Sequence, residues 1–302
     1  PAWKEKENLP LLYKQISQVP FPEPFEWEWI IVDDHSPDGT IDVIRELSRQ
    51  DPRVRGIRLS RNSGSHLALS CGIREARGEC AVILAADLQD PPEVIPDLLE
   101  KWKQGGQTVW AVREEREGES ESSQLFSRIY YRFMKTVIGI REMPPTGADF
   151  FLLDRTVIDA VNQFRESNIS LLALITWLGF RQEQVLYTKK ARLHGSSGWT
   201  LKKKLSLILA SITSFSHFPI RLMSYFGFAT AIAGFLFAVK VILNAFTGHP
   251  ATGWSSLMVV LLVLGGAQMM MLGILGEYLW RTLDASRRRP PYMIEEVIDP
   301  SL

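Results

Sequence analysis

The sequence IIVDDHSPDGT occupies Ile30–Thr40 and joins an apolar run to two consecutive carboxylates and a turn. The apolar half is typical of a buried strand. Asp38 and the glycine after it favour a turn, and Thr40 or Asp38 can cap a helix that begins at Ile41. Turn chemistry does not explain Asp33 and Asp34 at the carboxyl end of the strand, where open α/β sheets bind ligands such as a ribose or a base. We therefore predict a strand, a turn and a helix that carry a nucleotide site.

Short apolar strands alternate with helices from Trp27 to about Lys190. We expect strands at Trp29–Val32, Val54–Leu59, Ala81–Ala85, Thr108–Val112, Asp149–Leu153 and Gln184–Lys190. We expect helices near Ile41–Arg49, Ser65–Arg77, Pro92–Lys103 and Gln124–Ile138. The alternation predicts an α/β, Rossmann-like domain over residues 1–200, with a mostly parallel sheet and helices on both faces. Because the chain opens on a helical pattern, we expect the first strand of this domain to be missing.

A second acidic segment, Ala86–Glu93, reads ADLQDPPE and follows another buried run. Its double proline can start a helix at the first turn. Asp87 and Gln89 are alternate residues, which point to the same side in an extended segment. Their oxygen atoms are ligands of the kind that a hard divalent cation on a diphosphate requires. We therefore predict a Mg²⁺ or Mn²⁺ site at Asp87 and Gln89, with possible help from Asp90.

Composition argues against two kinds of site. The chain has 34 basic and 34 acidic residues, so no net field attracts nucleic acid, and we expect no nucleic-acid partner. The cysteines, Cys71 and Cys80, have no metal-ligand spacing, so we expect reduced thiols in a cytosolic domain.

Two long apolar segments, Leu222–Val239 and Ser255–Gly276, close the chain. Each is long enough to cross a hydrocarbon core of about 30 Å, so we predict transmembrane helices at 222–246 and 254–280 and a tail at 281–302. The alternative is a buried helical hairpin in a soluble protein. Small residues along the spans permit close packing between helices and predict a homo-oligomer: Gly227, Ala231, Gly266, Gly273 and Gly276.

Basic residues flank the spans but are absent from the loop at 247–253, which by the positive-inside rule places both termini and the large domain in the cytoplasm. These flanking residues are Lys202, Lys203, Lys204, Arg221, Arg281, Arg287, Arg288 and Arg289. Residues 201–221 combine the lysine triplet with periodic apolar residues and predict an interfacial amphipathic helix. The alternative for this segment is a helix of the cytosolic core.

Five segments, in order, resemble motifs of glycosyltransferase family 2 in its polyisoprenyl-phosphate branch, the type of dolichyl-phosphate mannose synthase and bactoprenol glucosyl transferase. The opening residues are similar to P-x-Y-N-E-x-x-N, and later segments match D-D-x-S-x-D-G-T, R-N-x-G and A-D-L-Q-x-P-P-E. The segments that carry the resemblance are Pro1–Asn8, Asp33–Thr40, Leu59–Gly64, Ala86–Glu93 and Gly147–Phe150. With the two spans, the resemblance covers essentially the whole chain.

The resemblance implies a metal-dependent enzyme with a GT-A fold in a bacterial inner membrane. Such an enzyme transfers a hexose, with inversion, from a nucleotide sugar to a polyisoprenyl phosphate. We expect glucose from UDP-glucose and undecaprenyl phosphate as acceptor. GDP-mannose or a modified pentose such as an aminopentose remains open as the donor sugar.

The resemblance also implies roles for individual residues. Glu5 and Asp33 would bind the nucleoside, within a nucleotide-sugar site that includes Pro1, Asp34 and Asp87. Asp149 matches the position of the catalytic base. The lipid phosphate is already anionic near neutral pH, so Asp149 could equally orient a substrate. The alternative is a loop carboxylate that pairs with a nearby arginine.

Cations are needed for the lipid phosphate and the leaving diphosphate. Arg113, Arg128 and Arg192 fit these roles, and an exposed surface arginine is the alternative for each.

Three residues depart from the family pattern. Trp3 and Lys4 replace the usual tyrosine and asparagine, and Ala85 stands where many relatives carry the first aspartate of a D-x-D pair. A processive polysaccharide synthase would carry a Q-x-x-R-W element, which this sequence lacks. Ala85 favours a catalytically inactive membrane scaffold. The retained acids, Asp87 among them, argue against that alternative.

Overall fold

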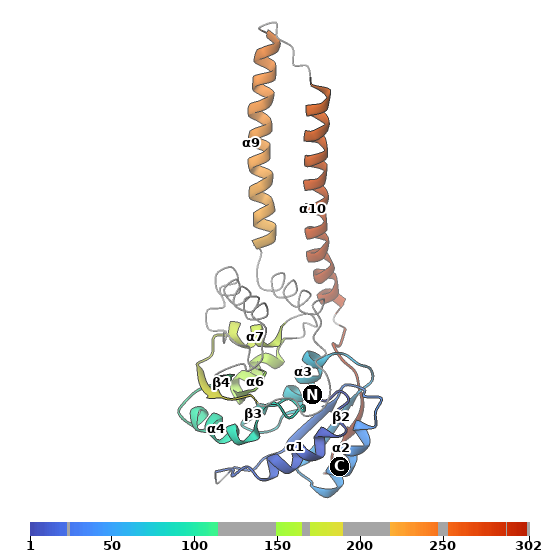
Figure 1. Cartoon of the computed structure of the whole chain (residues 1–302), viewed down its shortest axis with the longest axis vertical. Coiled ribbons are helices and arrows are strands. Elements are labelled where there is room, and N and C mark those ends of the chain that lie inside the picture. Colours follow the sequence, from blue (N-terminus) through green and yellow to red (C-terminus); the bar gives the residue numbers. More distant parts are fainter. Residues whose placement is uncertain are drawn as a thin grey trace. The chain divides into compact units, whose positions relative to one another are not determined.

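The computed structural model describes residues 1–22, 25–113, 149–164, 170–189, 218–246, 253–287 and 289–300. The chain forms two compact units, coloured along the sequence in Figure 1. The first unit combines Pro1–Ala210 with Pro290–Leu302, and the second is Ser211–Arg289. Several predicted features lie outside the described residues: the helix at Gln124–Ile138, Arg128, Arg192 and the amphipathic segment at 201–217.

The strands of the first unit form two mixed sheets. One has the order β1-β2-β7, made of Trp29–Asp33, Val54–Leu59 and Ile294–Ile298, in which β1 and β2 are parallel and β7 is antiparallel to β2. The other has the order β3-β5-β4-β6, made of Cys80–Ile83, Phe151–Asp154, Thr108–Arg113 and Gln182–Tyr187.

The prediction of a mostly parallel sheet is wrong. Strand β5 lies between β3 and β4 and is antiparallel to both, whereas β4 and β6 are parallel. The strand–helix alternation that suggested parallel pairing holds only as far as β4. A pattern of strands and helices does not reveal that a later strand returns between two earlier ones.

Helices cover both faces of the β1–β2 pair, as predicted. Ile31 packs in a cluster with residues of α1 (Asn8–Ser17) and α2 (Thr40–Gln50). The next residue, Val32, packs in another cluster with residues of α3 (Ser65–Glu75). This difference follows from the pleat, because successive side chains of a strand point to opposite faces.

Other helices complete the first unit. A short 3₁₀ turn, η1 (Pro92–Val94), leads into α4 (Ile95–Lys103), whose buried leucines pack with Val109, Ala111 and Leu152 of the second sheet. Helices α6 (Arg155–Asn162) and α7 (Leu171–Trp177) follow β5. The sequence analysis did not predict α6 or α7.

The segment expected to be a simple tail contains β7, which adds a strand to β2. Gly56 of β2 allows this contact, because a Cβ there would collide with Ile44 and lie 3.1 Å from Cδ1 of Ile298. Arg45 of α2 donates two hydrogen bonds to Glu296, at 3.1 and 2.6 Å. The buried Arg55 pairs with Asp299 at 3.1 Å. Backbone pairing and ion pairs therefore hold the end of the chain in the first unit.

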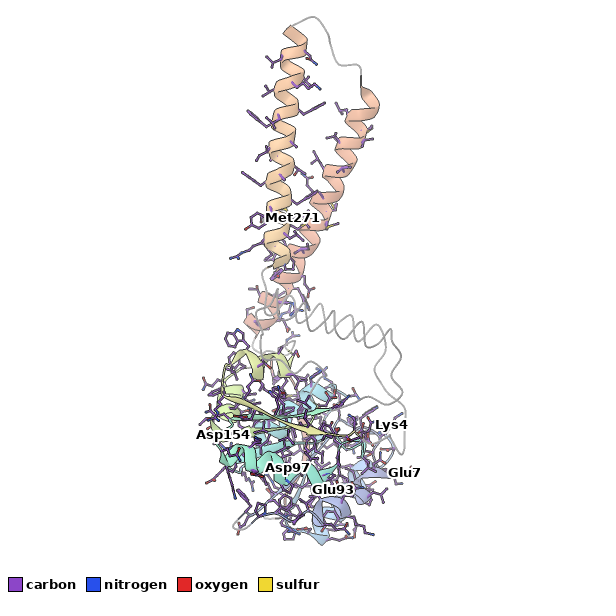
Figure 2. All side chains as sticks on the ribbon, turned by 60° about the vertical axis from the view of Figure 1, so that its left-hand side comes forward. Lys4, Glu7, Glu93, Asp97, Asp154 and Met271 are labelled. Carbon is purple, nitrogen blue, oxygen red and sulfur yellow. The ribbon has the colours of Figure 1, made fainter. Side chains whose placement is uncertain are left out.

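The second unit contains two long apolar helices, α9 (Phe218–Phe246) and α10 (Trp254–Arg287). Their candidate spans, Pro219–Val241 and Leu257–Arg287, have mean hydropathies of 1.8 and 2.3, and none of either window is buried. Figure 2 draws the side chains along both helices and labels Met271, which is 41% exposed. This exposure disfavours the alternative of a buried hairpin, which would hide these faces.

Both helices are therefore long and apolar enough to cross a membrane. Among the described residues, a Cβ added at Gly227, Gly266, Gly273 or Gly276 would meet nothing within 4 Å. The homo-oligomer and the side of the membrane on which the termini lie stay predictions.

Candidate active site

Asp33 ends β1 and is wholly buried. Its Oδ1 accepts a hydrogen bond from the backbone N–H of Ser36 at 3.0 Å. Its Oδ2 has no hydrogen-bond donor among the described residues, and the Nε of Arg58 lies 3.9 Å away. A buried carboxylate oxygen without a donor is costly, so it calls for a donor from a bound molecule. The predicted nucleoside site thus has one open acceptor.

Asp34 is also buried, but both of its oxygens are used within the chain. Oδ1 accepts from the backbone N–H of Ser63 at 2.6 Å, and Oδ2 accepts from that of Gly64 at 2.8 Å. Burial raises the pKa of Asp34 even though these two hydrogen bonds act in the opposite direction. Gly64 has a φ of +94°, a conformation that favours glycine. This geometry gives Asp34 the task of holding the loop before α3, whereas its predicted contact with the nucleotide is untested.

The first residues of the chain lie along β1. The backbone N–H of Ala2 donates to the carbonyl of Val32 at 2.8 Å, and the N–H of Asp34 donates to the carbonyl of Ala2 at 3.0 Å. These bonds place Pro1 beside the strand end. The segment that was expected to lack a strand therefore contributes a one-residue parallel bridge, Ala2 with Asp33.

The turn after β1 fixes the next residues of the opening segment. The N–H of Lys4 donates to Oγ of Ser36 at 3.0 Å, and the N–H of Glu5 donates to Oγ1 of Thr40 at 3.2 Å. The side chain of Glu5 accepts from Nδ2 of Asn8 at 2.6 Å. The structure therefore brings Pro1, Glu5 and Asp33 to the same strand end, as the resemblance implies.

Asp87 and Gln89 belong to a turn instead of a strand. Strand β3 ends at Ile83, before the expected end at Ala85, and Leu88 has a φ of +60°. Oδ1 of Asp87 accepts from the backbone N–H of Gln89 at 3.2 Å. The argument from strand alternation is therefore wrong, although the turn still holds the two residues close together.

The metal site stays a prediction with a sparse donor set. Across the described ranges, no group of three or more His, Cys, Asp and Glu side chains lies close enough to hold a metal ion. Asp87 supplies a carboxylate and Gln89 an amide carbonyl, which are oxygen donors that Mg²⁺ and Mn²⁺ accept. Two such donors fit an ion that takes its remaining ligands from a nucleotide diphosphate and water.

Asp90, considered as a further ligand, is held by the fold through Oδ1 alone, since its Oδ2 has no hydrogen-bond partner among the described residues. It is buried, and its Oδ1 accepts from the phenol of Tyr187 at 2.5 Å and lies 3.2 Å from Nζ of Lys189. Burial and the neighbouring charge of Asp90 raise the pKa of Tyr187. The sequence analysis missed Tyr187, although it lies at the carboxyl end of a strand that is parallel to β4, where polar residues are informative.

Arg113 and Asp149 form an ion pair. Nη2 of Arg113, at the end of β4, donates to Oδ2 of Asp149 at 3.1 Å. The arginine side chain is 13% exposed and the carboxylate is 62% exposed, so a substrate could reach Asp149. Burial alone would lower the pKa of Arg113, but hydrogen bonding with Tyr187 and the charge of Asp149 raise it. The pairing considered as an alternative for Asp149 is present, and its catalytic role stays a prediction.

Three further residues near Asp33 were not predicted: His35, Arg58 and Glu295. His35 has a φ of +60°, and its Nδ1 lies 3.0 Å from the carbonyl of Leu59 and 3.1 Å from Oε2 of Glu295. Nε of Arg58 lies 3.0 Å from the same carboxylate oxygen. No local signal could have identified Glu295, because it is 260 positions from His35 in the sequence.

Comparison with known proteins shows the family of the chain. The family model for glycosyl transferase family 2 matches residues 1–162. The glycosyltransferase YkcC of Bacillus subtilis is 38% identical over 98% of this chain and 92% of its own length. The bactoprenol glucosyl transferase of Shigella phage SfV is 33% identical over 98% of this chain and 96% of its own. A prophage bactoprenol glucosyl transferase homologue of Escherichia coli is also 33% identical, over 98% of this chain and 97% of its own.

These matches extend beyond the acidic segments to nearly the whole length of the relatives. The first unit has the GT-A fold that the sequence predicts. The acidic strand ends described above lie within the part that the family model matches. The chain belongs to glycosyltransferase family 2.

Proposed function

We propose that the protein transfers a hexose from a nucleotide sugar to a polyisoprenyl phosphate at a membrane surface. Glucose from UDP-glucose and undecaprenyl phosphate are the substrates we favour, because relatives that match nearly the whole chain are named bactoprenol glucosyl transferases. Two helices apolar enough to span a bilayer are consistent with a lipid acceptor. The observation that carries the proposal is the buried Asp33, with one open oxygen at a strand end.

The donor would bind across the carboxyl end of β1. Oδ2 of Asp33 would accept a hydrogen bond from the ribose or the base, and Glu5 lies at the same strand end. Asp34 would hold the loop before α3 in place, beside its predicted contact with the donor. A backbone-held loop of this kind is pre-organised, which lowers the entropy lost on binding.

Asp87 and Gln89 would hold Mg²⁺ or Mn²⁺ on the diphosphate of the donor. When bound, such an ion neutralises charge that develops on the leaving nucleoside diphosphate. Ala85 removes one carboxylate from the usual set, so we expect weak affinity for the metal without the nucleotide. The turn at Leu88 keeps the two donors close.

The acceptor would be held by charge at the ends of β4 and β6. A phosphate oxygen of the lipid attacks the anomeric carbon from the face opposite the diphosphate, the bond to the diphosphate breaks, and the configuration inverts. Because the acceptor oxygen is already anionic, Asp149 is required less as a base than as an orienting group. The guanidinium of Arg113, which is charged at neutral pH, would attract the phosphate.

The reaction can be tested with the full chain in detergent. Radiolabelled UDP-glucose, GDP-mannose and an aminopentose nucleotide are each incubated with undecaprenyl phosphate and Mg²⁺ or Mn²⁺, and labelled glycolipid is extracted. We expect transfer from UDP-glucose that requires the metal and falls sharply in Asp33→Asn. Asp97→Asn, which changes an exposed carboxylate on α4 (Figure 2), should transfer at the original rate. A folded protein that makes no glycolipid from any donor would favour the inactive scaffold.

We also propose that the first unit and both ends of the chain lie in the cytoplasm, because basic residues flank both apolar helices. In sealed vesicles with the cytoplasmic face outward, a protease should digest the first unit. Protection of that unit in intact vesicles would contradict this orientation.

A further inference from the structure

Strand β7 is irregular near the site. Its pairing with β2 matches Arg58 with Glu296 and then Leu59 with Ile294, so the register shifts between these pairs. Glu295 is the extra residue in this shift and has no Cα partner on β2. A bulge of this kind re-aims a side chain, and bulges are common beside active sites.

The re-aimed side chain of Glu295 holds two groups at once. Its Oε2 lies 3.0 Å from Nε of Arg58, in an ion pair in which that Nε makes no hydrogen bond among the described residues, and 3.1 Å from Nδ1 of His35. The same ring nitrogen lies 3.0 Å from the carbonyl of Leu59. Because both partners of Nδ1 are acceptors, this nitrogen carries the hydrogen atom. The contacts with Glu295 and Leu59 hold His35 in its left-handed conformation directly after the two acidic residues.

Arg58 is shared between two carboxylates of different exposure. Its Nε is 3.0 Å from the half-exposed Glu295 but 3.9 Å from Oδ2 of the buried Asp33. At the longer distance the guanidinium offsets the charge of Asp33 without donating a hydrogen bond to it. The open oxygen of Asp33 therefore depends on where Glu295 holds Arg58.

We propose that Glu295 is a positioning residue of the donor site, supplied by the C-terminal strand. It keeps Arg58 back from Asp33, so that Oδ2 of Asp33 stays available to a donor group of the nucleoside. Without Glu295, the guanidinium is free to close on Asp33 and to compete with the nucleotide. This inference rests on the proposed function, because it assigns a nucleoside to the open oxygen.

The adjacent residue, Glu296, provides a matched control. It forms its two hydrogen bonds with Arg45 of α2, so it is an acidic residue of the same strand that also pairs with an arginine. Hydrogen bonds from Arg45 and, to a smaller extent, the charge of Arg58 lower the pKa of Glu296, but no hydrogen bond or ion pair joins Glu296 to Asp33, His35 or Arg58. Loss of either carboxylate should therefore loosen β7 similarly, whereas only the loss of Glu295 should alter the donor site.

The test uses the full chain in detergent and compares Glu295→Ala, Glu295→Gln and Glu296→Ala. The readouts are KM for UDP-glucose, kcat, the dissociation constant of UDP by calorimetry, and the thermal midpoint. We expect Glu295→Ala to raise KM and the UDP dissociation constant about tenfold, the size of one charge-assisted hydrogen bond, with kcat little changed. Glu295→Gln keeps an acceptor oxygen and should lie between Glu295→Ala and the wild type.

Glu296→Ala should lower the thermal midpoint at least as much as Glu295→Ala but leave UDP binding unchanged. Suppose that the wild-type protein transfers sugar. Equal UDP binding by Glu295→Ala and Glu296→Ala would then overturn this inference but not the proposed function. A wild-type protein that neither binds UDP nor makes glycolipid would instead overturn the proposed function.

Discussion

The two acidic segments at the strand ends are held in different ways. After β1, Asp33 and Asp34 accept hydrogen bonds from backbone N–H groups, two of which lie 29 and 30 positions further along the chain. After β3, Asp87 is bonded within its own turn, and Asp90 is held by the side chains of Tyr187 and Lys189.

This difference separates a site fixed by distant main-chain groups from one fixed by a local turn at Asp87 and by side chains at Asp90. Backbone donors cannot change rotamer, so the geometry after β1 is set by the fold itself. The segment after β3 depends on a local turn and one buried pair, so a bound ion and diphosphate would complete it. We therefore expect substitutions after β1 to affect folding and binding together, whereas Asp87 should affect mainly catalysis.

The largest expected effect is that of Asp87→Ala. Loss of the carboxylate should reduce glycolipid synthesis about a thousandfold, because the metal on the leaving group loses its charged ligand. The free energy of unfolding should change by less than about 1 kcal/mol, since the bond to Gln89 is local. Transfer assays and denaturant unfolding measure both quantities, with Asp97→Ala as the control. An unchanged rate in Asp87→Ala would remove the catalytic distinction between the two segments.

The next effect is that of Asp34→Ala, which should destabilise the first unit. Two backbone N–H groups would lose a charged acceptor, and we expect the free energy of unfolding to fall by about 3 kcal/mol. Hydrogen exchange should increase at Ser63 and Gly64 before it increases elsewhere. Normal protection of these two amides would show that Asp34 does not hold the loop.

A smaller effect should follow from Tyr187→Phe. Asp90 would lose its phenolic donor but keep Lys189, so we expect a loss of about 2 kcal/mol in the free energy of unfolding. Tyr13→Phe is a matched control, because Tyr13 donates to Asp51, a carboxylate that Arg53 also holds through several hydrogen bonds. The control should cost about 1 kcal/mol or less. Equal losses in the two variants would contradict a special role for the buried Asp90.

The smallest effect concerns pH and the turn after β1. Burial alone would raise the pKa of Asp38, but hydrogen bonds from the hydroxyl and N–H of Thr40 outweigh it and lower the pKa. A lowered pKa in the folded state means that the ionised group adds stability above its unfolded value of about 3.9. That stability is lost as the pH falls through the lower folded value.

Asp38→Asn should therefore cost about 1 kcal/mol at neutral pH, and the cost should vanish in acid. Denaturant unfolding of wild type and variant across this range measures the difference. A difference that does not depend on pH would show that the charge of Asp38 does not contribute.

The sequence analysis was most accurate for the bounds of strands, which depend on the local pattern of residues. The strand expected at Val54–Leu59 has those bounds, and β1 runs one residue longer than expected. Trp29–Val32 is an apolar run that ends at a polar turn, whereas Val54–Leu59 places Arg55 and Arg58 among apolar residues. The strand predicted at Gln184–Lys190 is observed at Gln182–Tyr187, a shift typical of element ends.

The features that the sequence analysis missed depend on contacts between residues that are far apart in the sequence. Strand β7 has two consecutive glutamates in its centre, which resemble a solvated tail until Arg45 and Arg58 are seen to meet them. The sequence analysis singled out the acidic residues that follow β1 and β3 because of their position after a strand. Their individual tasks were hidden, because Asp34 and Asp90 are fixed by partners 29 and 97 positions away.

The first unit is interrupted in the chain by α9 and α10, and its last strand follows both. A ribosome therefore synthesises β7 only after it has synthesised both apolar helices. Until then Arg45, Arg55 and Arg58 of the nascent domain lack the carboxylates of Glu296, Asp299 and Glu295. If the helices insert as they emerge, each new molecule reaches the bilayer before β7 pairs with β2. A fragment that ends before β7 therefore lacks the third strand of this sheet.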